Sequence, residues 1–124
     1  MRIGFDAKRA FKNFTGLGNY SRDTIRVLSS FYTKNDYFLY TPKATLNQRL
    51  KFLENQSKIK IRSPKKIIDK LFSVFWRSKN IINDLKKDSL DIYHGLSHEL
   101  PIGIENTKIK SIVTIHDLSL IHIS

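Results

Sequence analysis

The chain has 124 residues, of which 40% are hydrophobic and 27% are charged, and this balance is typical of one globular domain with its own core. It contains no cysteine, which excludes a disulfide framework and a thiolate metal site. The net charge of +11 favours polyanionic partners such as nucleic acid, phosphorylated small molecules or an anionic membrane face.

The first half of the chain alternates between strand-like and helix-like segments. Residues 2–7 (RIGFDA) form a short apolar stretch and predict a first strand. Residues 17–31 predict a helix, because its expected buried face recurs at spacings of three and four and carries Leu17, Tyr20, Thr24, Val27, Leu28 and Phe31. Residues 37–41 (YFLYT) predict a second strand, which Pro42 ends.

The second half continues this alternation. Residues 45–55 predict a helix with Leu46, Leu50 and Leu53 on one face. Residues 58–62 (KIKIR) predict a peripheral third strand, and a helical stretch in two pieces is expected between Pro64 and Lys87. Residues 90–94 (LDIYH) and 110–116 (KSIVTIH) predict a fourth and a fifth strand.

Strands separated by helices predict an α/β fold with a doubly wound, mostly parallel, Rossmann-like sheet. Ligands of such sheets bind outside the carboxyl ends of the strands. Candidate site residues should therefore follow Ala7, Thr41, His94 and His116. No apolar run is long enough to cross a bilayer and no secretory signal pattern begins at Met1, so we expect a cytoplasmic location.

Two glycines, Gly16 and Gly18, lie between the first strand and the first helix. Glycine allows close approach of a ligand to the backbone, and a helix start suits a phosphate. However, the dinucleotide fingerprint requires a third glycine where Ser21 stands, and a Walker loop requires lysine where Asn19 stands. The spacing alone therefore leaves a phosphate cradle and a simple turn equally open.

Several stretches together resemble the amino-terminal half of family 4 retaining glycosyltransferases of the GT-B fold. They are MRIGFDAKRAF, NFTGLGNYSRDTIRVL, DIYHGLSHELP and KSIVTIHDL, in the family's order and over nearly the whole chain. The resemblance implies transfer of a hexose from a nucleotide-sugar donor to a glycan or lipid-linked acceptor, as in polysaccharide biosynthesis. The donor lies between two Rossmann-like domains in that family, and no further cofactor is implied.

The resemblance also implies site residues. It places Gly16, Leu17 and Gly18 at the donor phosphates, and His116 with Asp117 at the transferred sugar, where an imidazole can hydrogen-bond a hydroxyl without titrating. On the acceptor side it places His94 and Asp6, although a turn or capping role for Asp6 is slightly favoured.

Two further segments carry competing interpretations. The spacing of His94 and His98 differs from the zincin order, and Pro101 and Gly103 predict a loop, so we expect no metal site. Residues 64–79 combine apolar and basic side chains; we favour burial against the sheet over peripheral contact with the inner face of an anionic membrane.

We expect residues 1–118 to form the domain and residues 119–124 to be a non-native tail, because LSLIHIS (residues 118–124) resembles a translated adapter sequence. The family's second domain would carry most donor contacts, so this chain alone is expected to show no transferase turnover. The alternative function is a non-catalytic basic α/β module that binds nucleic acid or another polyanion, although no specific nucleic-acid-binding motif is present.

Overall fold

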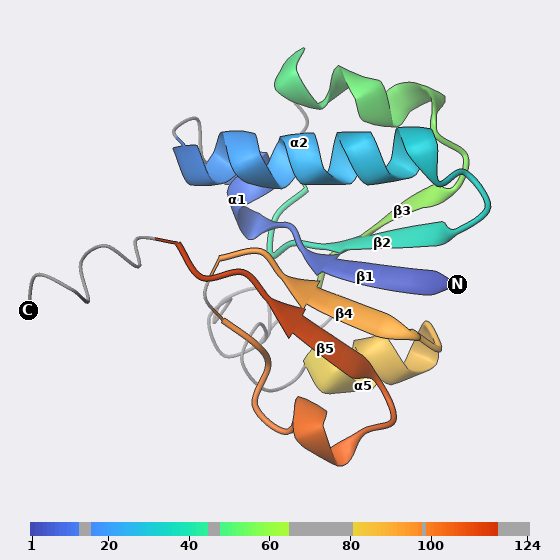
Figure 1. Cartoon of the computed structure of the whole chain (residues 1–124), viewed down its shortest axis with the longest axis vertical. Coiled ribbons are helices and arrows are strands. Elements are labelled where there is room, and N and C mark those ends of the chain that lie inside the picture. Colours follow the sequence, from blue (N-terminus) through green and yellow to red (C-terminus); the bar gives the residue numbers. More distant parts are fainter. Residues whose placement is uncertain (13–15, 45–47, 65–80, 98, 117–124) are drawn as a thin grey trace, which may run out of the picture.

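A five-stranded, all-parallel sheet forms the centre of the molecule in the computed structural model, which describes residues 1–12, 16–44, 48–64, 81–97 and 99–116 (Figure 1). The strand order is β3-β2-β1-β4-β5, and the register of all four neighbouring pairs is parallel. The strands are β1 (Arg2–Asp6), β2 (Asp36–Tyr40), β3 (Ile59–Arg62), β4 (Ile92–Gly95) and β5 (Lys110–Val113). This is a Rossmann-like α/β fold, as predicted, and its strand order reverses between β1 and β4.

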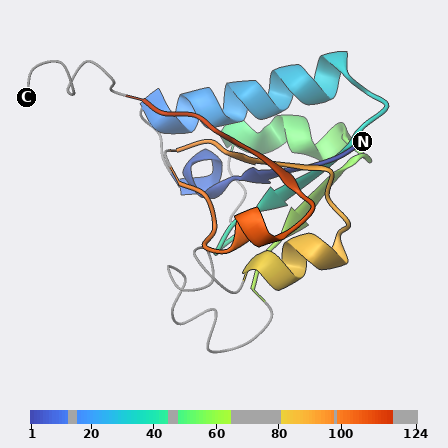
Figure 2. The same ribbon diagram turned by 60° about the horizontal axis from the view of Figure 1, so that its bottom comes forward.

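Helices cover both faces of the sheet, so the fold is doubly wound (Figure 2). The α-helix α2 and the 3-10 helix η1 lie on one face, and α5 lies on the other. The helical elements are α1 (Lys8–Lys12), α2 (Gly16–Phe31), η1 (Gln48–Asn55), α5 (Ile81–Lys87) and η3 (Ile104–Asn106). None of the described helices is long and apolar enough to cross a bilayer.

The two faces of the sheet carry two separate hydrophobic clusters. Strand β2 shows why: Tyr37 and Leu39 point to the α2 face, whereas Phe38 and Tyr40 point to the α5 face, and all four are buried. A strand buried on both faces is apolar at every position, which explains the continuous run YFLY. Because parallel strands need this cover, the helices on both faces are required for stability.

The predicted buried face of α2 is only partly correct: Leu28 packs against the core, but other members of that face do not. Val27 and Phe31 are 41% and 78% exposed, and Tyr20 is also exposed. The side that faces the sheet carries Gly18, Ser21, Arg22, Ile25 and Ser29. Small residues allow the helix axis to approach the sheet closely, and their polar atoms are satisfied locally: the Ser21 hydroxyl donates to the carbonyl of Leu17 at 2.9 Å. Hydrophobic periodicity could not identify this side, because most of its residues are small or polar.

Arg22 is the most polar member of this buried side. Its guanidinium donates to the carbonyl oxygen of Ala10 in α1 at 2.9 Å and to Oδ1 of Asn19 at 2.6 Å. These bonds satisfy a group that would otherwise be costly to bury. They also tie α1 to α2, which keeps the start of α2 close to the end of β1.

The remaining predictions differ from the structure mainly at element ends. The first four strands lie within two residues of their expected bounds, but β5 ends at Val113, so His116 lies beyond the strand. Residues 48–55 form a 3-10 helix instead of an α-helix, and α1 and η3 were not predicted. Leu46 and residues 65–80, which include most of the predicted amphipathic segment, lie outside the described residues.

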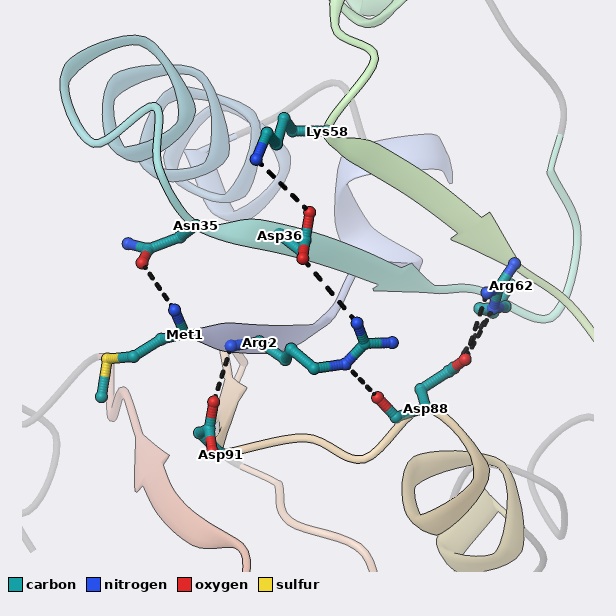
Figure 3. Close-up of polar contacts among 8 residues, drawn as sticks. All are labelled: Met1, Arg2, Asn35, Asp36, Lys58, Arg62, Asp88 and Asp91. Carbon is teal, nitrogen blue, oxygen red and sulfur yellow. Dashed lines mark hydrogen bonds and ion pairs between the residues drawn. The ribbon is translucent and has the colours of Figure 1, made fainter.

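A network of hydrogen bonds connects the end of α5 to the sheet (Figure 3). Asp88 follows α5 and accepts hydrogen bonds from the Arg62 guanidinium at 3.1 Å and from the Tyr40 hydroxyl at 2.6 Å. Arg2 donates through Nε to the backbone oxygen of Asp88 at 2.6 Å. The carboxylate of Asp88 raises the pKa of Arg62, and burial beside it raises the pKa of Tyr40. These bonds fix the end of α5 against β1, β2 and β3.

Candidate functional site

The point where the strand order reverses lies between β1 and β4, and ligands of open parallel sheets bind outside the carboxyl ends of strands at such a point. Strand β1 ends there with Asp6, and β4 presents His94 near its end. The register pairs Phe5 with His94, so the two strand ends lie directly side by side. Four predicted site residues belong to segments at this edge of the sheet: Asp6, His94, Gly16 and His116.

The start of α2 is open at this edge. Gly16 is the first residue of the helix and is exposed, and a Cβ added there would meet no atom of the described residues within 4 Å. Leu17 is half-buried and Gly18 is buried on the sheet side of the helix. The first N–H groups of a helix have no partner within the helix and carry a partial positive charge. Among the described residues, none would contact a side chain at Gly16, whereas Gly18 is buried on the side of α2 that faces the sheet.

His94 is positioned by the sheet and by one hydroxyl group. Its ring lies against Phe5, with 5.7 Å between the ring centroids, and its Nε2 lies 2.7 Å from Oγ1 of Thr114. Burial lowers the pKa of His94 below its ordinary value of 6.5. The imidazole is therefore neutral at pH 7 and offers one donor and one acceptor nitrogen.

His116 lies after β5 and contacts both β4 and α2. Its Nε2 lies 2.9 Å from the backbone oxygen of Leu96, the residue after β4. A carbonyl oxygen only accepts, so Nε2 of His116 carries a proton and donates it to this bond. The ring of Tyr20 meets the His116 ring edge to face, with 4.9 Å between centroids and 82° between planes. The second turn of α2 and His116 are therefore neighbours.

Asp6 has a local structural contact at this edge. Its Oδ1 accepts a hydrogen bond from the backbone N–H of Lys8, the first residue of α1, at 3.2 Å. This two-residue reach is typical of an aspartate turn that starts a helix. It supports the capping interpretation of Asp6 that the sequence slightly favoured.

Two predicted residues cannot be placed, since Asp117 and His98 lie outside the described residues, as does the tail 119–124. Among the residues that the structure does describe, no group of three histidine, aspartate or glutamate side chains is arranged to hold a metal ion.

Sequence reasoning missed Thr114 and the role of Tyr20. Thr114 was read only as a β-branched strand residue, and Tyr20 was assigned to the buried face of α2. The alternation of the strand gives a signal for Thr114, because it lies two residues after Ile112, whose register partner is His94, and therefore on the same face. No local pattern indicates that Tyr20 turns toward the end of β5.

No family model, no curated protein and no solved structure matches this chain. The case for its function therefore depends on its own residues and on the arrangement of this edge.

Proposed function

We propose that this chain is the amino-terminal, acceptor-side domain of a retaining glycosyltransferase of GT-B architecture, which transfers a hexose from a nucleotide-sugar donor to a glycan or lipid-linked acceptor. One observation carries the proposal. The open start of α2 and the imidazole of His116 lie at the same carboxyl edge, joined by the Tyr20–His116 ring contact at 4.9 Å. The sequence resemblance requires these two features to face one donor.

The arrangement suggests a division of tasks within the crevice. Backbone N–H groups at the start of α2 would hold the diphosphate, because a helix start favours negative charge. Nε2 of His94 is bonded to Thr114 and Nε2 of His116 to Leu96, so both imidazoles are held in fixed orientations from which they would contact hydroxyl groups of the sugar or the acceptor. Stabilisation of the leaving phosphate would come largely from a second domain across the cleft. We therefore expect donor binding without sugar transfer by residues 1–124, and robust transfer would contradict the two-domain proposal.

Nuclear magnetic resonance titration with UDP-glucose, GDP-mannose and a short oligonucleotide tests the proposal. A nucleotide-sugar site predicts saturable shifts confined to the region of Gly16, His94 and His116, with modest dependence on salt. Diffuse polyanion binding, which the net charge of +11 would support, predicts shifts spread over the basic surface and an affinity that falls steeply with salt. Saturable binding of the oligonucleotide alone would overturn the glycosyltransferase proposal.

A charge-removal control separates the two outcomes further. Lys108 is exposed and precedes β5, so it lies at the opposite edge of the sheet from the crevice. The substitution Lys108→Ala should weaken diffuse binding by a polyanion and leave nucleotide-sugar binding at the wild-type level. The reverse pattern would count against a site at the carboxyl edge.

A further inference from the structure

Thr114 joins three elements through one side-chain oxygen. Its Oγ1 lies 2.7 Å from Nε2 of His94 in β4 and 3.2 Å from the phenol oxygen of Tyr20 in α2. A hydroxyl has one donor and two acceptor positions, so it can serve both partners at once. Its backbone N–H donates to the carbonyl of Gly95 at 2.8 Å, which continues the β4–β5 ladder and fixes where the side chain starts.

The contacts continue from Tyr20 to the second histidine. The Tyr20 ring packs against the His116 ring, and Nε2 of His116 donates to the carbonyl of Leu96 at 2.9 Å. Tyr20 lies four residues after Gly16, which is one helical turn, so the two residues share one side of α2. A path of direct contacts therefore runs from His94 through Thr114 and Tyr20 to His116, beside the start of the helix.

We propose that Thr114 is a positioning residue of the crevice: its hydroxyl orients the His94 imidazole and, through Tyr20, holds the start of α2 at a fixed distance from His116. This inference rests on the proposed function, because it matters only if the helix start and the two histidines act on one ligand. Thr114 itself acts through its neighbours and is not assigned a contact with the ligand.

The ligand-free protein provides the first test. Thr114→Val keeps the shape of the side chain and removes the hydroxyl, and Thr114→Ser keeps the hydroxyl. We expect Thr114→Val to shift the pKa and the ring ¹⁵N signals of His94 and to move the His116 ring signals as Tyr20 reorients, whereas Thr114→Ser stays close to wild type. Unchanged histidine signals in Thr114→Val would overturn the positioning role.

A matched control removes a different threonine hydroxyl at the same edge of the sheet. Thr41 follows β2, is fully buried and donates through Oγ1 to the carbonyl of Lys43 at 3.0 Å, away from both histidines. Thr41→Val should lower stability without moving the His94 and His116 signals. If it moves them as much as Thr114→Val does, the effect is general loosening of the fold and the proposal fails.

Binding of UDP-glucose provides the second test. Loss of one positioning hydrogen bond should weaken the affinity by about threefold to tenfold in Thr114→Val, and Thr114→Ser should restore it. Tyr20→Phe removes only the exposed phenol oxygen and leaves the contact between Thr114 and His94 in place, so it tests the link from Thr114 to α2 by itself if Thr114→Val does not fold. If Thr114→Val and Tyr20→Phe bind UDP-glucose with the same affinity as the wild-type protein, the positioning role alone is overturned. Absence of binding by the wild-type protein would contradict the donor-binding part of the proposed function, and the ligand-free signals of His94 and His116 would then test the positioning role by themselves.

Discussion

Replacement of Gly16 by alanine tests whether this residue takes part in ligand binding, because the substitution should raise the stability of the protein and lower its affinity for the ligand. Gly16 is the first residue of α2, its φ is not in the positive range that requires glycine, and a Cβ there would meet no described atom within 4 Å. Alanine restricts the unfolded chain more than glycine does, so Gly16→Ala should stabilise the protein by about 0.4–1 kcal/mol. For a domain of this size, that corresponds to a rise in Tm of roughly 2–6 °C.

The same methyl group should weaken ligand binding. It would occupy the open space through which a diphosphate approaches the backbone N–H groups at the helix start, so the affinity for UDP-glucose should fall while the stability rises. Urea denaturation and calorimetric titration of the same protein preparations measure the two effects. Higher stability with unchanged affinity would remove Gly16 from the site.

A matched glycine substitution checks the stability argument. Gly103 has a φ of 92°, in the left-handed region that alanine adopts only with strain. Gly103→Ala should therefore destabilise the protein by about 1–2 kcal/mol. If Gly16→Ala also destabilises by more than about 1 kcal/mol, the start of α2 is not open and the reasoning about the crevice is wrong.

Three further predictions concern the sheet and its polar contacts. Gly95→Ala should destabilise the protein by about 1–3 kcal/mol in urea denaturation, because the new Cβ would collide with the backbone oxygen of Glu99; a neutral effect would contradict this packing. Tyr40→Phe should cost about 1.5–3 kcal/mol, since it removes the hydrogen bond to the Asp88 carboxylate, and a cost below about 0.5 kcal/mol would show that the bond contributes little. The pKa of His94 is lower in the folded protein than in the unfolded chain, so the unfolded chain binds this proton at a higher pH. The stability that the buried neutral imidazole contributes is therefore fully present above pH 6.5 and decreases as the pH falls toward the folded pKa. His94→Gln should reduce the loss of stability across that range, and an equal loss in both proteins would refute the assignment.

The sequence predicted that the site lies at the carboxyl edge of the sheet, but it did not predict most of the contacts between the side chains there. The alternation of strands and helices predicted a parallel sheet, and the rule for open sheets then pointed to the segments after Ala7, Thr41, His94 and His116. The strand order in the structure places the reversal between β1 and β4. Asp6 and His94 were assigned to the acceptor side through the family resemblance, and the structure places both near the ends of their strands. The contact between Tyr20 and His116 was not predictable, because it joins residues from the two ends of the chain.

The buried side of α2 shows the same limit within one element. The sequence determined that residues 17–31 form a helix, since periodicity and propensity act over neighbouring residues. It did not determine which side faces the sheet, because Ser21 and Ser29 are buried for their small size and Phe31 is left exposed. Whether small polar residues or large apolar ones are buried depends on the shape of the surface against which the helix packs, and the sequence of the helix does not contain that shape.

The sequence by itself determined the five strands, the long helix α2, the doubly wound α/β class and the two glycines at the start of that helix. Tertiary structure alone decided that Thr114 would join His94 to Tyr20 and that Nε2 of His116 would donate to the carbonyl oxygen of Leu96. The physical reason is range: strand and helix patterns arise from contacts between near neighbours, whereas these hydrogen bonds require β4, β5 and α2 to be packed together first.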